Sequence, residues 1–361
     1  MLPPLLRALL NLPAYLAGVS VLFWCFQGAA LTGFLKWWRL SGPRSDVQAV
    51  LDYLKAAFRY RALKLPGPDI AEGKVVYLFN HRGWGDFFID MWVSGARARP
   101  LSRRAVGMAF PAFTSSLMSI KSILLFNRAG VKDTEKFNRW LDTELAEGPQ
   151  NSLLVYPEGT RSQKAQSLPL KRGMLRYAFS RKLPVQVVIT AGKEEVLNER
   201  RRWAHLGRTL VTGCSEVLES AQFEDFEEFA GAVQRLWDEQ WERVHAAPRS
   251  GFPPLVPRFP ELRYSAAILA SESAALALWT AVLAALTYGG VRLLARLAVA
   301  GPAGRIAVVA LALWTAASLA AAALLPPPKS RGAGAKAASS AAGEAQGAGR
   351  AATVAALPKQ D

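Results

Sequence analysis

Two long apolar stretches near opposite ends of the chain constrain its fold most strongly. Residues 13–35 contain no charged side chain, and residues 306–325 are twenty consecutive residues without a charge. Either stretch, as a helix, is long enough to cross a hydrocarbon core of about 30 Å. We therefore predict an N-terminal membrane anchor within residues 1–44 and C-terminal membrane segments within residues 256–328.

The N-terminal stretch is followed by a basic and aromatic flank, KWWRL at residues 36–40, which is typical of a membrane interface. A cleaved signal peptide ending near residues 28–30 is the alternative, but the apolar run continues past these small residues. Basic residues are more numerous after the stretch than before it, where Arg7 stands alone: Lys36, Arg39 and Arg44. This asymmetry predicts that most of the chain lies on the cytoplasmic side.

The C-terminal stretch has an apolar neighbour at about 267–289, with which it could form a hairpin. Glu272 lies near the start of that neighbour and must reach the interface or find a partner. The loop expected between the two segments contains Arg292, Arg296 and Arg305, which argues against a non-cytoplasmic position. Two crossings, one crossing and a partly interfacial position all stay open. The Ala/Gly/Ser-rich tail, 329–361, is predicted to be disordered.

The central region, residues 45–255, alternates short apolar runs with amphipathic stretches. The alternation predicts an α/β domain with a parallel or mixed sheet, whose ligands lie at the carboxyl ends of the strands. Amphipathic periodicity predicts helices at 133–148 and about 223–246. The runs expected to form strands are 74–79, 104–110, 122–126, 152–156 and 184–190.

The composition favours a membrane surface as the partner of this chain. The net charge is +16 and 51% of the residues are hydrophobic, a combination that suits anionic lipid. No nucleic-acid partner is expected, because the basic residues are dispersed and form no binding motif. The two cysteines, Cys25 and Cys214, give neither a disulfide framework nor a metal-binding cluster.

The segment NHRGWGD, residues 80–86, places His81 five positions before Asp86, directly after a predicted strand. A histidine there can accept a proton near neutral pH, and a carboxylate on its other nitrogen fixes the tautomer and stabilises the imidazolium. The alternative is an exposed histidine beside an aspartate that caps a helix. Trp84, within the same segment, is expected to pack under the loop rather than to line an acyl path.

A second segment, YPEGTRS at residues 156–162, also follows a predicted strand. Its proline and glycine shape a tight loop, Glu158 and Thr160 are polar, and Arg161 offers donors suited to a phosphate.

Further basic residues follow in FNR, which ends in Arg128, and in PLKRG, where Lys171 precedes a helix beginning near Gly173. Each could be a solvated surface charge. Because three of these loops follow strands, His81, Arg128 and Arg161 are expected at one sheet edge.

With these segments the chain resembles the membrane glycerolipid acyltransferases, over roughly residues 70–215. NHRGWGD is similar to the family's NHxxxxD block and YPEGTRS to its FPEGTRS block. FNR and LPVQVV resemble two further blocks, with departures at Asn127, where aspartate is common, and at Val187, where a second proline is frequent. The departures leave the substrate subtype open more than the chemistry.

The resemblance implies that His81 is a general base and that Asp86 orients it. The hydroxyl of a lysophospholipid would then attack the thioester of acyl-CoA, a co-substrate, with no metal or other cofactor. No cysteine or Gly-x-Ser-x-Gly serine offers a nucleophile for an acyl-enzyme. The residues implied to bind the phosphate of the acceptor are Arg128, Glu158, Gly159, Thr160 and Arg161, with Lys171 adding to the pocket.

The resulting hypothesis is an integral membrane O-acyltransferase that converts 1-acyl-sn-glycerol 3-phosphate to phosphatidic acid. The resemblance implies the endoplasmic reticulum, and the asymmetry of basic residues predicts that the catalytic domain lies on its cytoplasmic side. Acceptors that the same machinery could use are lysocardiolipin, lysophosphatidylinositol and glycerol 3-phosphate. A basic membrane scaffold that retains the fold without turnover is the non-enzymatic alternative. The acyl-chain preference and the oligomeric state stay open.

Overall fold

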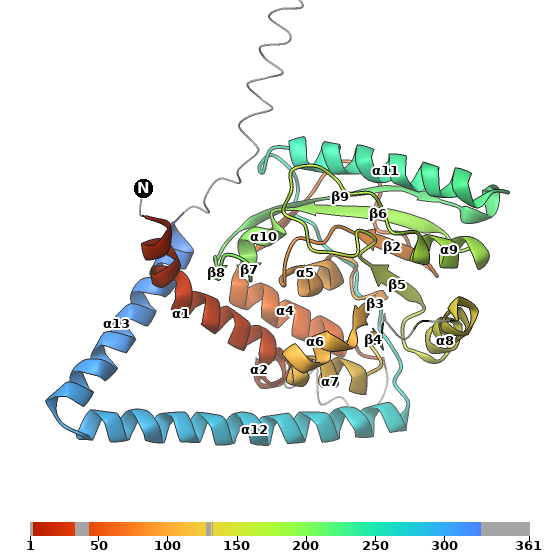
Figure 1. The fold of residues 1–361 in the computed structure, drawn as a ribbon. Helices are drawn as coiled ribbons and strands as arrows, with labels where there is room; N and C mark the ends of the chain where they lie inside the picture. Colours follow the sequence, from red (N-terminus) through yellow and green to blue (C-terminus); the bar gives the residue numbers. More distant parts are fainter. Residues whose placement is uncertain (1–2, 33–42, 128–130, 132, 326–361) are drawn as a thin grey trace, which may run out of the picture.

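The structure, a computed structural model, describes residues 3–32, 43–127, 131 and 133–325. Within these residues one seven-stranded sheet has the order β1-β9-β6-β2-β5-β3-β4 (Figure 1). All neighbouring strands are parallel except β6 and β9, which are antiparallel. The predicted α/β domain with a mixed sheet is confirmed. The strands of the sheet are β1 (Arg61–Lys64), β2 (Val76–Phe79), β3 (Ala98–Arg103), β4 (Leu124–Phe126), β5 (Ser152–Val155), β6 (Val185–Ala191) and β9 (Thr209–Leu218).

The sequence predicted four of these strands correctly, namely β2, β4, β5 and β6. The strand predicted at 104–110 is wrong, because Arg104–Ala109 forms helix α6 and β3 lies directly before it. None of the α6 residues is buried, and Val106 packs against the core only as a partly buried residue. The buried part of β3 is instead Ala98, Arg99 and Pro100, a sequence with no strand-like pattern.

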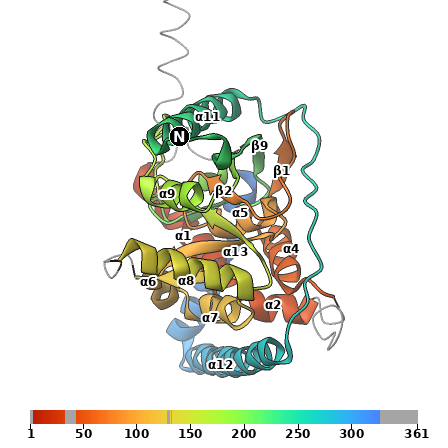
Figure 2. The same ribbon diagram turned by 90° about the vertical axis from the view of Figure 1, so that its right-hand side faces the viewer.

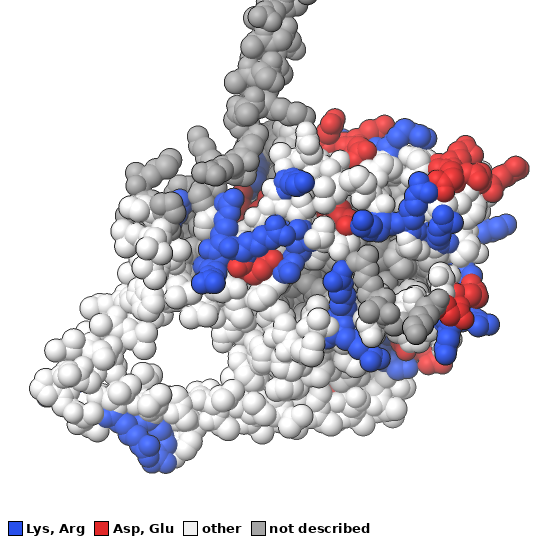
Figure 3. Space-filling view, in the orientation of Figure 1, with Lys and Arg blue, Asp and Glu red and all other residues white. Residues whose placement is uncertain are grey.

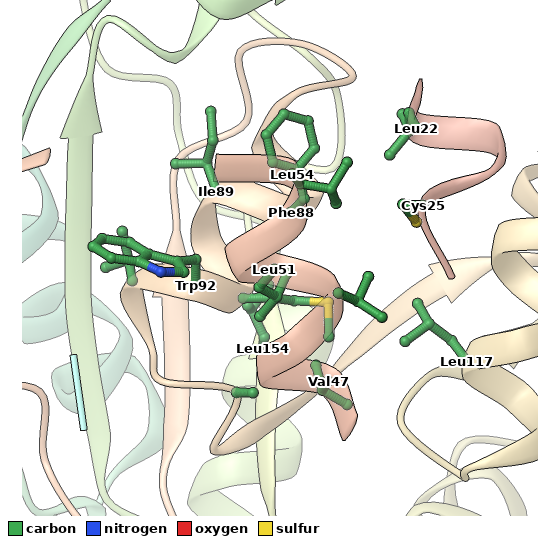
Figure 4. Packing of buried hydrophobic residues seen from close by; sticks show 14 of the residues in the cluster. Leu22, Cys25, Val47, Leu51, Leu54, Phe88, Ile89, Trp92, Leu117 and Leu154 are labelled. Atoms are coloured by element: carbon green, nitrogen blue, oxygen red, sulfur yellow. The ribbon is translucent and has the colours of Figure 1, made fainter. Parts of the chain in front are cut away.

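Helices cover both faces of the sheet. The sheet therefore separates the hydrophobic core into two clusters. On one face α4 (Asp46–Phe58) and α5 (Asp86–Val93) pack together, with Leu51 and Leu54 against Phe88 and Ile89 (Figure 4). α11 lies over the other face (Figures 1 and 2). The remaining helices between the two apolar ends are α6 (Arg104–Ala109), α7 (Pro111–Ser119), α8 (Thr134–Glu147), α9 (Arg172–Ser180), α10 (Lys193–Val196), the 3-10 turn η2 (Ser220–Gln222) and α11 (Phe226–Ala246).

The helices predicted at 133–148 and 223–246 are confirmed as α8 and α11. Each begins at an aspartate whose side chain accepts backbone N–H groups of the first turn, Asp133 for α8 and Asp225 for α11. The apolar faces of both helices pack into the same cluster.

The apolar stretch predicted to span at 13–35 is divided in the structure. Helix α1 (Pro4–Phe23) ends before α2 (Cys25–Thr32) begins. Cys25, Phe26 and Ala29 are buried in the same cluster as α4 and α5, so α2 contributes to the protein core. An uncharged segment suits protein interior and lipid equally, which is why composition did not separate the two uses. The KWWRL flank lies outside the described residues.

The C-terminal apolar region forms α12 (Ala266–Val299) and α13 (Pro302–Leu324). Together with Leu5–Phe23, these are three helices long and apolar enough to cross a membrane. The predicted loop is shorter than expected, since Arg292 and Arg296 lie in α12 and Arg305 in α13. The predicted disordered tail lies outside the described residues.

Glu272, in the second turn of α12, pairs with another residue of the protein, which is one of the two outcomes predicted for it. Its side chain is buried and forms an ion pair with Arg44, which also lies 2.6 Å from Asp46 at the start of α4. This buried group of three charges attaches α12 to the α/β domain.

Candidate active site

The predicted pair of His81 and Asp86 is brought together at the carboxyl end of β2. His81 follows this strand closely, and Asp86 is the first residue of α5. The Nδ1 atom of His81 lies 2.8 Å from Oδ2 of Asp86. When Nδ1 donates its hydrogen to Asp86, Nε2 keeps the lone pair that accepts a proton. The His81 side chain is 25% exposed, whereas that of Asp86 is fully buried, so a substrate can approach only the histidine.

The Asp86 carboxylate is held by several donors. Its Oδ2 accepts hydrogen bonds from the backbone N–H groups of Arg82 and Gly83. Burial raises the pKa of Asp86, but the ammonium group of Lys193, 4.0 Å away, and the hydrogen bond from His81 outweigh it, and the pKa lies below its usual value. Asp86 is therefore ionised at neutral pH and can stabilise an imidazolium.

Behind the pair lies a buried network that the sequence did not predict. The Nζ atom of Lys193 is 2.7 and 2.9 Å from the two carboxylate oxygens of Asp90, and it donates to the carbonyl of Asn80. The Tyr156 hydroxyl donates to Asp90 over 3.0 Å, and its ring stacks on His81 with centroids 4.2 Å apart. The network thus supports both the carboxylate and the imidazole ring.

Two sequence signals could have identified part of this network. Asp90 lies four residues after Asp86, on the same face of α5. Lys193 directly follows Gly192, at the end of β6, where a site was expected. Burial raises the pKa of the Asp90 carboxyl to about 7, against the lowering effect of Lys193.

The YPEGTRS loop is attached to the backbone of His81. Glu158 is buried, and its Oε2 accepts the N–H of His81 over 2.9 Å. The N–H of Ser162 donates to the carbonyl of His81 over 2.8 Å, and Gly159 supplies the turn between them with φ +66°. Burial raises the pKa of Glu158 to about 7. Glu158 thus faces the histidine loop.

The predicted phosphate-binding residues differ in their surroundings. Thr160 is exposed, and Arg161 is 37% exposed at its side chain, with Nη1 2.7 Å from Oε1 of Glu199. Lys171 precedes α9 as an exposed residue, and its backbone N–H donates to Pro157 over 2.7 Å. Arg128 lies outside the described residues.

Arg82, also missed by the sequence reasoning, joins the two loops. Its buried guanidinium lies 2.6 Å from Glu194 and donates to the carbonyls of Ser162 and Lys164 over 3.0 and 2.7 Å. Trp84 in the same loop packs edge-on against Phe110, with ring centroids 5.0 Å apart, in agreement with the predicted packing role.

The other two histidines differ from His81 in their environment. Burial lowers the pKa of both His205 and His245 to about 4, so both are neutral at physiological pH. Within the described part of the chain, no group of three or more His, Cys, Asp or Glu residues could hold a metal ion.

Part of the chain is similar to known proteins. Residues 54–190 match the profile of the family described as Acyltransferase. A 1-acyl-sn-glycerol-3-phosphate acyltransferase of Cocos nucifera is 23% identical over 144 residues, which cover 36% of this chain and 41% of that protein. The enzyme of the same name from Limnanthes douglasii is 24% identical over 134 residues, covering 36% and 45%. The alignments thus span less than half the length of these curated relatives.

Among solved structures, the chain is similar to the 1-acyl-sn-glycerophosphate acyltransferase PlsC from Thermotoga maritima. The superposition has a TM-score of 0.47 at 15% sequence identity, and covers 64% of this chain and 96% of that one.

Proposed function

We propose that this chain, whose residues 54–190 match the Acyltransferase family, transfers an acyl group from acyl-CoA to the free hydroxyl of a lysophospholipid. The first candidate acceptor is 1-acyl-sn-glycerol 3-phosphate, which would give phosphatidic acid. The observation that carries the proposal is the His81–Asp86 pair, with a buried carboxylate 2.8 Å from Nδ1 of a partly exposed histidine.

In the proposed mechanism, Nε2 of His81 removes the proton of the acceptor hydroxyl as its oxygen attacks the thioester carbonyl carbon. Asp86 stabilises the imidazolium that forms. When the tetrahedral intermediate collapses, the carbon–sulfur bond breaks and the CoA thiolate takes the proton from His81. The acyl ester is the other product.

A direct transfer agrees with the cysteines of the chain. Cys25 and Cys214 are both buried, and burial raises the pKa of the Cys214 thiol to about 12. Neither offers the exposed thiolate that an acyl-enzyme would need.

The acceptor phosphate is assigned to Arg161, whose partly exposed guanidinium belongs to the loop that holds His81. By their sequence positions Arg128 and Lys171 would add charge. The three apolar helices support a membrane location, where lysophospholipids are found. We propose the cytoplasmic face of the endoplasmic reticulum as that location.

The test is an assay of the purified full chain with labelled acyl-CoA and a panel of lysophospholipids. Removing a general base typically costs about 10²- to 10⁴-fold in rate, so we expect this loss in kcat for His81→Ala and a smaller loss for Asp86→Asn. Wild-type activity no greater than that of His81→Ala would favour the scaffold. Activity with lysocardiolipin alone would change the acceptor but not the reaction.

A further inference from the structure

A short hairpin beside the catalytic loops carries three consecutive arginines. Its strands are β7 (Leu197–Asn198) and β8 (Trp203–Ala204), which pair antiparallel. The turn between them begins with Glu199 and continues with exposed residues: Arg200, Arg201 and Arg202. Neither the fold nor the proposed proton transfer requires three exposed arginines at this position.

The hairpin is fixed to both loops of the candidate active site. Glu199 pairs with Arg161 through Oε1 at 2.7 Å, and its Oε2 accepts the N–H of Trp84 over 3.1 Å. Arg200 donates to the carbonyl of Arg161 over 2.6 Å. These hydrogen bonds therefore fix the position of the arginine turn relative to His81.

Gly83, the first of two glycines in the NHRGWGD segment, makes this approach possible. A Cβ atom at Gly83 would lie 3.1 Å from the carbonyl oxygen of Leu197 and 3.3 Å from Oε2 of Glu199. Contacts this short force the neighbouring atoms to move, so the loop and the hairpin are matched in shape.

The turn has more positive charge than its surroundings neutralise. Glu199 is already paired with Arg161, and Arg201 lies over the ring of Trp203 at 4.9 Å. Within the described residues neither Arg201 nor Arg202 has an ion-pair partner. Figure 3 shows basic side chains gathered on the face of the molecule where β7 and β8 lie in Figure 1.

We propose that Arg201 and Arg202 bind the phosphate groups in the nucleotide part of the acyl-CoA donor, an inference that rests on the proposed function. Guanidinium groups suit phosphate oxygens, to which they donate paired hydrogen bonds. Both substrates carry phosphate, but the donor carries several phosphate groups and the lysophosphatidate acceptor a single one. The exposed arginines lie outside the histidine loop. They could therefore bind the nucleotide of the donor at the protein surface while its thioester reaches His81.

The test compares two variants with the same loss of charge in the full chain. Arg201→Gln/Arg202→Gln removes side chains that make no hydrogen bond to the catalytic loops. Arg139→Gln/Arg235→Gln removes two exposed arginines of α8 and α11. We expect the hairpin variant to raise the KM for acyl-CoA about three- to tenfold, as for exposed charge pairs, with kcat and the acceptor KM unchanged. The control variant should match wild type.

Two further measurements identify the source of the phosphate. A donor without its 3′-phosphate should show a smaller difference between wild type and the hairpin variant. Binding to vesicles of anionic phospholipid should be equal in both proteins. A raised acceptor KM or weaker vesicle binding, with the donor KM unchanged, would overturn the proposal in favour of lipid phosphate.

Calorimetric titration of CoA separates this proposal from the proposed function, because it needs no turnover. His81→Ala protein should bind CoA as wild type does, and the hairpin variant should bind it more weakly. An inactive wild type that shows this binding difference contradicts the proposed function alone. An active wild type whose CoA affinity and donor KM are unaffected by the hairpin substitutions contradicts this inference alone.

Discussion

Near His81, the buried carboxylates of Asp86 and Asp90 share one compensating group, the ammonium of Lys193. Lys193 is fully buried, pairs with Asp90 and lies 4.0 Å from Asp86. Removing one member of a buried ion pair leaves an uncompensated charge, which typically costs about 3 to 5 kcal/mol. We expect Lys193→Met to lower the free energy of unfolding by about that amount, measured by chemical denaturation.

The companion variant is Lys193→Met/Asp90→Asn, which removes both charges and keeps an acceptor for the Tyr156 hydroxyl. It should recover at least half of the lost stability. A double variant no more stable than the single one would show that the pair is not coupled as its geometry indicates.

Glu158 gives a prediction about pH. Its pKa is about 7 in the folded chain and near 4.5 when unfolded, so the folded state binds the proton more tightly. The stabilising contribution is complete below about pH 4.5 and is lost as the pH rises through about 7. Glu158→Gln has no carboxyl to titrate at this position. Between pH 5 and pH 8 its unfolding free energy should therefore decrease by about 2 kcal/mol less than that of wild type.

The measurement is denaturant unfolding at both pH values. Glu216→Gln, at an exposed position of β9, is the matched control and should behave as wild type. If Glu158→Gln and wild type lose equal stability over this range, Glu158 is not the group that titrates.

At the scale of residues, the sequence predicted contacts between residues of the same short segment. His81 and Asp86 share a loop, so their spacing alone brought them together. Lys193 and Tyr156 come from segments 112 and 75 residues away from His81, and only the pairing of β2 with β5 and β6 places them beside it. The place of Lys193 at the end of β6 was a signal that it lies near the site, but a single sequence does not show which side chains it meets there.

Among the elements, the fit of the β7–β8 hairpin against the NHRGWGD loop can be tested with two glycines of that loop. A Cβ at Gly83 would meet backbone at 3.1 Å, whereas a Cβ at Gly85 would have ordinary contacts from 3.5 Å. Overpacking of this kind typically costs about 1 to 3 kcal/mol. We therefore expect Gly83→Ala to lower the melting temperature and the activity, and Gly85→Ala to change the melting temperature much less. Equal decreases in melting temperature for the two variants would mean that the hairpin moves to accommodate the added Cβ atom at little cost.

The mispredicted elements share a physical cause. The run 104–110 has the composition of a strand, yet most of its helix is exposed, while the buried half of β3 contains Arg99 and Pro100. Two nitrogens of the Arg99 guanidinium donate to the carbonyl and the carboxylate of Glu144, near the end of α8. Tertiary contacts, which composition does not encode, decided both cases.

Over the whole molecule, the two C-terminal helices are attached to the rest of the chain at both ends, α12 to the α/β domain and α13 to α1. α12 is joined through Glu272 and through the indole of Trp279, which donates to Ser115 of α7 over 2.7 Å. α13 is joined where the Ser318 hydroxyl accepts the N–H of Ala14 in α1 over 2.9 Å. Between these attachments the two helices extend away from the rest of the chain, meet at their connection and enclose an opening with α1 (Figures 1 and 3).

This arrangement favours helices that lie along the membrane surface over a hairpin that crosses it. With 34 residues, α12 is about 51 Å long, well beyond a hydrocarbon core of about 30 Å, and part of it packs along α2 and α7. Its far end carries Arg292 and Arg296, with Arg305 following in α13. Three arginines are costly to translocate and interact well with lipid phosphates on the near side.

We therefore predict that the α12–α13 connection lies on the same side of the membrane as the α/β domain. Cys25 and Cys214 are 0% and 6% exposed, so a new exposed cysteine can be labelled with little background. In sealed vesicles, an impermeant maleimide should label Ala303→Cys, beside the connection, and Ser250→Cys, on the domain, to the same extent. Labelling of Ala303→Cys only after the vesicles are opened, with Ser250→Cys already labelled, would show that the helices cross.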